Sequence, residues 1–164
     1  DLRRFDAAMP RTRLTAHVAL APEGARWVGP LQATNAIAGP WDKGLLPVAA
    51  LSAQAALTPE NAVLDAMRVD LGVGGRLQGR ATATPTRIDL HLDTQALDLR
   101  GLHSALRQTA LRGHIDAAID GERQSASAQL TQQDVHLAFD ATRAGDDIRI
   151  RRFSAQARGG EARG

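Results

Sequence analysis

The alternation of apolar and polar residues in 74–93 is the feature that most limits how this chain can fold. Before Pro85, small or apolar residues fall on every second position: Leu77, Gly79, Ala81 and Ala83. After Thr86 the phase reverses, and the apolar positions are Ile88, Leu90 and Leu92. Period-two alternation is typical of a strand with one dry and one wet face. A turn at Pro85-Thr86 puts both dry faces on one side and predicts these pairs: Ala83 with Ile88, Ala81 with Leu90, and Gly79 with Leu92.

The same alternation recurs along the rest of the chain. It predicts further strands at 14–20, 26–36, 48–57, 63–71, 111–119, 125–131, 135–141 and 147–157. Gly29-Pro30 interrupts the predicted strand at 26–36. Because proline lacks an N–H, this dipeptide indicates a sheet edge or a bulge. Asp120-Gly121 predicts a hairpin turn. A turn at Gln132-Gln133 would pair Ala128 with Leu137 and Ala126 with Phe139, again small opposite large.

No long amphipathic helix is present to cover the dry faces of these strands. They must therefore pack on another sheet, close on themselves or form a trough. Aromatic residues make up only 3 % of the chain, and the dry faces are rich in Ala and Gly. A closed sandwich normally interdigitates bulkier side chains. We therefore expect an all-β fold: an elongated, curled, mostly antiparallel sheet, an open half-barrel with an apolar concave interior. The alternative is that the apolar stripe forms a closed core.

The opening of the chain returns at Asp98. Residues 98–115 align with 1–18 without a gap, with identities that include Asp98 with Asp1, Leu111 with Leu14, and His114 with His17. In the first copy the spacing of Phe5 and Met9 predicts a short helical turn. Internal repeats of this kind indicate a modular, elongated architecture. We therefore divide the chain into a first β repeat unit at 1–97 and a second, truncated unit at 98–164 of the same continuous sheet.

Composition excludes several function classes. Basic and acidic residues number 20 and 18, and the net charge is +2. Arginines alternate with acidic and amide residues instead of clustering on one face, which argues against a nucleic-acid binder. The absence of cysteine excludes disulfides and zinc–thiolate sites. No apolar run approaches the length of a membrane-spanning helix. The chain begins at Asp1 without a methionine, so we expect it to be a piece of a longer protein.

No catalytic or metal site is predicted, and no cofactor. Four histidines fall on predicted wet strand faces: His17, His91, His114 and His136. His91 between Asp89 and Asp93 is the best candidate for a metal ligand, but a site needs three or four converging ligands, and a solvated face is the simpler interpretation. The glycines of 72–79 precede no helix, so a dinucleotide site is not expected. The densest basic patch is Arg149, Arg151 and Arg152, interpreted as a solvated edge or a contact for lipid headgroups.

Three stretches carry a resemblance to a known family. They are TNAIAGPWDKGLLPV at 34–48, LGVGGRLQG at 71–79, and the repeated Asp-Leu-Arg opening. Together they resemble segments of the TamB proteins of Gram-negative bacteria, within the wider AsmA-like group. The resemblance implies a periplasmic protein anchored in the inner membrane, with a long β-sheet folded like a taco around a hydrophobic groove. It also implies a TamA/BamA-type outer-membrane barrel as partner, and no enzymatic activity.

Two functions attach to this resemblance. The first is conduction of phospholipids between the inner and outer membranes, with acyl chains held in the groove. The dry-face residues that would line it are Leu77, Ala81, Ala83, Ile88, Leu90, Leu92, Leu111, Ile115, Ile119, Leu130, Val135, Leu137, Phe139, Ile148 and Ile150. The alternative is a periplasmic scaffold that assists the assembly of outer-membrane proteins and autotransporters by pairing unfolded strands with its edges.

Overall fold

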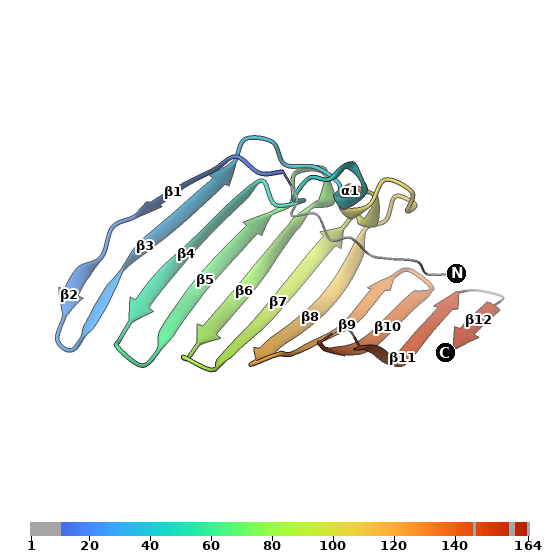
Figure 1. Ribbon diagram of the computed structural model, residues 1–164. Helices are drawn as coiled ribbons and strands as arrows, with labels where there is room; N and C mark the ends of the chain where they lie inside the picture. The colour runs from blue at the N-terminus through green and yellow to red at the C-terminus, as the bar shows by residue number, and fades with distance from the viewer. Residues whose placement is uncertain (1–10, 146, 158–159, 164) are drawn as a thin grey trace.

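The computed structural model describes residues 11–145, 147–157 and 160–163 and joins them into one antiparallel β-sheet (Figure 1). Its strands are β1 (Leu14–Val18), β2 (Ala21–Glu23), β3 (Arg26–Asn35), β4 (Ala50–Leu57), β5 (Ala62–Asp70), β6 (Arg76–Ala83), β7 (Arg87–Leu97), β8 (Leu111–Asp120), β9 (Arg123–Gln132), β10 (Val135–Ala144), β11 (Asp147–Ala157) and β12 (Gly160–Arg163). The connections contain the 3-10 turns η1 (Trp41–Lys43) and η2 (Gly72–Gly74) and the one-turn helix α1 (Leu99–Leu102). The helical turn predicted around Phe5 and Met9 lies outside the described residues.

The strands form a long meander. From β3 to β12 each strand lies beside the next one in the chain, and β1 occupies the outer side of β3. The prediction of an elongated, antiparallel all-β fold is therefore confirmed. The sheet is twisted and open and is not strongly curled (Figure 1), so the half-barrel shape expected from the sequence is not observed. Closing a barrel requires the two end strands of the sheet to pair with each other, whereas β1 and β12 stand at opposite ends of the observed strand order.

Apolar side chains form rows across the strands on one face of the sheet. The longest row joins residues that are directly opposite in neighbouring strands: Ala16, Ala33, Leu51, Val69, Leu77, Thr94, Gly113, Leu130, Leu137 and Ala155. Its polar member, Thr94, is buried, and its hydroxyl donates a hydrogen bond to the Arg76 carbonyl at 3.1 Å. The face with this row and the parallel rows through Leu92, Leu90 and Ile88 is called the apolar face below, and the opposite side the polar face.

One predicted hairpin register is confirmed and one is wrong. In β6–β7 the observed pairs are those predicted: Ala83 with Ile88, Ala81 with Leu90, and Gly79 with Leu92. In β9–β10 the register differs by two residues, so that Phe139 lies opposite Ala128 and Leu137 opposite Leu130. The reason is the position of the turn. Gln132 already pairs with Val135, and Gln133 adopts the positive φ of 50° that a tight two-residue turn requires.

Pro30 interrupts the edge of the sheet and not its interior. It lies within β3, opposite the break that separates β1 from β2. Both short strands keep the same register with β3, and Ala19 in the break still donates its N–H to the Pro30 carbonyl at 3.1 Å. Proline offers no N–H in return, so the ladder cannot continue through this point. The interruption predicted at Gly29-Pro30 therefore occurs as the break between β1 and β2, while β3 itself is continuous.

β5 contains a β-bulge that the sequence prediction missed. Leu64 lies opposite Ala81 and Met67 opposite Gly79, so Asp65 and Ala66 together face a single residue of β6. Ala66 has a φ of 48°, in the left-handed region. The signal was present in the sequence, because the apolar phase shifts by one position between Leu64 and Met67. The bulge restores both residues to the apolar face.

Ala66→Gly is expected to stabilise the protein by roughly 0.5–1 kcal/mol. A left-handed backbone costs a non-glycine residue about 1–2 kcal/mol, which exceeds the extra entropy that glycine loses on folding. Ala118, in a regular part of β8, is the matched control, and Ala118→Gly is expected to destabilise by about 0.5–1 kcal/mol. Urea unfolding of both variants tests this. Destabilisation of similar size in both would show that the φ of Ala66 carries no strain.

Long connections and α1 gather at one end of the sheet, which also holds the tight β9–β10 turn, and the other end carries short turns (Figure 1). Buried Asn35 anchors the first connection. Its side-chain oxygen accepts hydrogen bonds from the N–H groups of Arg13 and Ile37 at 3.0 and 3.2 Å, and its amide nitrogen donates to the Val48 carbonyl at 3.1 Å. A second anchor joins Asp98 to Thr109, whose N–H donates to the Asp98 carboxylate at 3.0 Å. These contacts hold both connections against the sheet.

Candidate functional site

The residues predicted to line a groove all lie on the apolar face. Some of them belong to the cross-strand rows. The others lie an even number of positions along the same strand from a residue of a row, so their side chains point to the same face. Ile88 lies opposite Ile119, for example, and Leu92 opposite Ile115. Alternation along each strand, combined with the observed registers, therefore brings the whole predicted set to one side of the sheet.

Exposure on the apolar face is graded along the strands. Near the end that carries α1, Leu111 is 1 % exposed and Leu77 and Leu130 are 7 % exposed. Near the tight turns at the other end, Ile88 is 43 % and Ile119 is 42 % exposed. The apolar face is therefore shielded at one end of the strands and open at the other.

The connections supply the cover of the shielded end. Leu99 and Leu102 of α1, together with Val48, pack against the buried cluster around Leu97 and Leu111. Burying a leucine contributes roughly 1.5–3 kcal/mol, so this cover is a main source of stability in the sheet. At the shielded end the apolar face behaves as the closed core that was the alternative expectation from the sequence.

The open end leaves large apolar side chains in contact with solvent. Away from the β1 edge, the exposed large side chains of the apolar face are Trp27, Ile88, Ile119, Phe139, Ile148, Ile150 and Phe153. They come from β3, β7, β8, β10 and β11, so they extend over most of the width of the sheet. We call this set the open apolar surface. Extended apolar patches on soluble proteins mark sites that bind lipid, protein or small apolar ligands.

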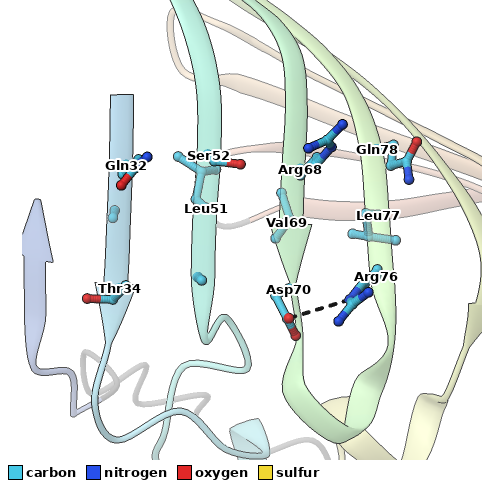
Figure 2. Close-up of a pocket in the computed structure, with 12 residues that line it drawn as sticks. Gln32, Thr34, Leu51, Ser52, Arg68, Val69, Asp70, Arg76, Leu77 and Gln78 are labelled. Carbon is cyan, nitrogen blue, oxygen red and sulfur yellow. Dashed lines mark ion pairs between the residues drawn. The ribbon is translucent and has the colours of Figure 1, made fainter. Parts of the chain in front are cut away.

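The polar face carries the hollow shown in Figure 2. It has a volume of about 530 Å³ and crosses β3 to β6, where Gln32, Ser52, Arg68 and Gln78 form one cross-strand row. Asp70 and Arg76 form an ion pair at its lower end, with 3.6 Å between Oδ2 and Nε. The sequence prediction did not single out this hollow, because its residues look like any solvated strand face. Its lining contains no histidine and no base poised beside a hydroxyl, so the arrangement offers polar contacts and no recognisable catalytic chemistry.

The histidine singled out as a candidate metal ligand pairs with a neighbouring strand instead. His91 Nδ1 lies 2.5 Å from Asp116 Oδ1 on β8. Asp89, on the same strand as His91, turns to Arg87, whose hydrogen bonds hold the pKa of the Asp89 carboxyl below its usual range. Among the described residues, no three acidic, histidine or cysteine side chains converge as metal ligands would.

The three arginines of the predicted basic patch lie at a β-bulge of β11. Arg152 lies opposite Asp140 across the β10–β11 pair, and the register shifts at the next residue, so that Arg151 is the extra residue of a bulge. Arg149 and Arg151 both line a shallow hollow on the polar face. The patch therefore lies on the side of the sheet away from the open apolar surface.

The stretches that suggested a family meet at the shielded end. Residues 34–48 form the connection between β3 and β4, residues 71–79 contain η2, and residues 98–110 contain α1. Asp42 in η1 accepts hydrogen bonds from the N–H and the hydroxyl of Ser104, and Gly74 in η2 packs on Gly101 in α1. These conspicuous motifs thus build the cover of the shielded end, a structural role.

Comparisons of the chain with protein-family models, with curated proteins and with solved structures find no match. The resemblance to TamB proteins therefore stays a prediction from sequence. In the part of the chain that the structure describes, no helix has the length and hydrophobicity needed to cross a bilayer.

Lowering the pH is expected to weaken the contact between the two connections below about pH 4. The hydrogen bonds from Ser104 lower the pKa of Asp42 from 3.8 to about 2. A depressed folded-state pKa gives stability that is complete above pH 3.8 and is lost as the pH falls towards 2. Asp42→Asn removes this titration, so its melting temperature is expected to depend less on pH between those values. Ser104→Ala removes the hydroxyl donor and is expected to reduce the pH dependence in part, and an unchanged pH profile in both variants would contradict the assignment.

Proposed function

We propose that this chain is a segment of a periplasmic, TamB-like protein that conducts phospholipids between the inner and outer membranes along its apolar face. The observation that carries the proposal is the continuity of the apolar rows from β1 to β11. The resemblance of 34–48 and 71–79 to TamB segments supports the same conclusion. In this proposal the chain is not an enzyme and uses no cofactor. The parent protein is anchored in the inner membrane and works with a TamA/BamA-type barrel.

The dimensions of the sheet suit a path better than a single binding site. Nine steps between neighbouring strands, at about 4.8 Å each, make the longest row about 43 Å long. That is roughly three times the thickness of one leaflet's hydrocarbon, about 15 Å. Acyl chains gain about 0.8 kcal/mol per buried CH₂ and need no directional contacts. A chain can therefore slide from strand to strand without meeting a deep minimum.

Small residues leave room for such a guest. The row through Leu90 consists largely of alanines: Ala55, Ala81, Ala117, Ala126 and Ala141. A row of alanines between larger side chains fills less space above the sheet than a row of leucines would. In the parent protein we propose that the sheet curls further over this row and makes the apolar face the concave interior of a groove.

Photocrosslinking tests the proposal. A photoreactive residue at Leu90 or Leu137, on the apolar face, is expected to capture phospholipid in vivo. The same residue at His91 or His136, their neighbours on the polar face, is expected to capture none. Equal capture from both faces would contradict conduction along the apolar face. Adducts that contain protein instead of lipid would favour the scaffold function.

A further inference from the structure

The outer edge of β1 has no neighbouring strand among the described residues. β1 and β2 pair with β3 on one side, and the other side ends the sheet. Leu14 is 59 % exposed and Val18 is 50 % exposed at this edge. An edge with exposed apolar residues and unpaired backbone groups is a site for pairing with another strand.

The internal repeat identifies the counterpart of this edge. The alignment that matches Leu14 with Leu111 continues through the next hairpin, where Gly24 corresponds to Gly121. Both glycines occupy the turn with a positive φ, of 60° and 57° respectively. The register corresponds too, because Val18 lies opposite Leu31 and Ile115 lies opposite Ala128 at the same alignment offset. The β1–β3 hairpin is therefore the first copy of the β8–β9 hairpin.

In the second copy this edge is covered. β7 pairs along the side of β8 that corresponds to the free side of β1, with Leu97 opposite Leu111 and Leu92 opposite Ile115. Leu111 is 1 % exposed there, whereas its counterpart Leu14 is 59 % exposed. β7 also leads directly into the Asp-Leu-Arg motif at Asp98. Leu111 is therefore buried where a strand with the pattern of β7 lies beside it, and Leu14 is exposed where no such strand is described.

The backbone of β1 is oriented to receive such a strand. Arg13 accepts a hydrogen bond from Ala36, and Ala19 donates one to Pro30, so the odd-numbered residues turn their peptide groups towards β3. In an antiparallel strand the alternate residues face the other side. The N–H and C=O groups of Leu14, Ala16 and Val18 therefore point to the free edge.

We infer that the free edge of β1 is the docking edge for an antiparallel strand of β7 type, an extended segment with the apolar and polar pattern that β7 presents to β8. By the repeat register, the strand places apolar residues opposite Leu14 and Val18 and carries polar residues between them. The added strand extends the sheet by one strand, and its apolar side chains point to the apolar face. The specificity lies in the phase, since a shift by one residue would turn every apolar side chain to the polar face.

Hydrogen exchange measured by NMR tests this inference, with a synthetic peptide of the β7 sequence 87–97 as the probe strand. The peptide is expected to slow exchange of the Leu14, Ala16 and Val18 amides by at least roughly tenfold. A peptide of the same composition with each apolar residue exchanged for its polar neighbour is expected to give no slowing. Equal slowing by both peptides, or slowing by neither, would overturn the inference.

A proline variant keeps the test independent of peptide solubility. Ala16→Pro removes an N–H that faces the free edge, and leaves the hydrogen bonds between β1 and β3 in place. The variant is expected to fold with the same melting temperature within a few degrees and to lose the protection of Leu14 and Val18 by the peptide. Protection in peptide-free protein that increases with protein concentration would assign the edge to a second copy of the chain and overturn the inference.

Discussion

Ile119→Arg is expected to reduce phospholipid transfer by roughly 100-fold and to leave the sheet folded. Ile119 belongs to the open apolar surface, where it lies opposite Ile88, and is 42 % exposed. A guanidinium at this point replaces part of the proposed hydrocarbon path by a charge. An arginine placed in a bilayer interior costs about 3 kcal/mol, which corresponds to about two orders of magnitude in rate. The exposure of Ile119 allows the new side chain to reach water, so folding loses little.

Ala118→Arg is the matched control for this experiment. Ala118 is the preceding residue of β8, so its side chain points to the polar face, where it lines a hollow with Asp116 and Ser125. The added charge is the same and the strand is the same, but the path is untouched. Transfer of a fluorescent phospholipid between vesicles, measured beside a thermal melt, separates the two. Equal transfer by both variants would show that lipid does not move along the apolar face.

Alternation in the sequence predicts the faces of this sheet because successive side chains of a strand point to opposite faces. The pairing of Ala83 with Ile88 follows from one turn and from a phase reversal across it. Strand 111–119 was predicted on the same grounds and is observed as Leu111–Asp120. Wherever a short turn joins two alternating strands, neighbouring residues contain almost all the information that the fold uses.

The failures come from places where geometry overrides the pattern. The β9–β10 register depends on the positive φ of Gln133. Glutamine rarely adopts this conformation, so the sequence does not predict it. The bulge at Asp65 and Ala66 changes the phase inside one strand, so a single alternation pattern cannot describe both halves. Bulges also bend strands. The curvature of the sheet therefore depends on local geometry that the apolar pattern does not encode.

The cover of the shielded end was not predictable from the sequence. Asp42 and Ser104 are 62 positions apart and lie in segments without periodicity, so nothing local indicates that their side chains meet. The anchoring of the first connection by Asn35 is equally remote from any pattern. The close packing of Gly74 on Gly101 of α1 appears only in the structure.

Gly101→Ala provides the strongest test of this cover, because helix propensity and packing predict opposite signs. In a helix alanine is favoured over glycine by up to about 1 kcal/mol, so α1 alone would be stabilised. A Cβ at position 101, however, would lie 2.3 Å from the Cα and 2.4 Å from the N of Gly74. Both atoms are backbone and are fixed by the hydrogen bonds that Gly74 makes with Leu71 and Asp98. The net expectation is destabilisation by about 2–3 kcal/mol.

The displacement of α1 makes the effect large. Leu99 and Leu102 pack against the buried cluster, and moving the helix would expose Leu97 and Leu111 beneath it. The control is Gly121→Ala, where φ is +57° and no atom lies within 4 Å of the added Cβ, so only the left-handed backbone costs about 1–2 kcal/mol. Urea unfolding should therefore rank Gly101→Ala below Gly121→Ala, and tryptophan fluorescence of Trp41 should report the loosened cover. Stabilisation by Gly101→Ala would mean that α1 does not pack on η2 and that the shielded end of the apolar face is open as well.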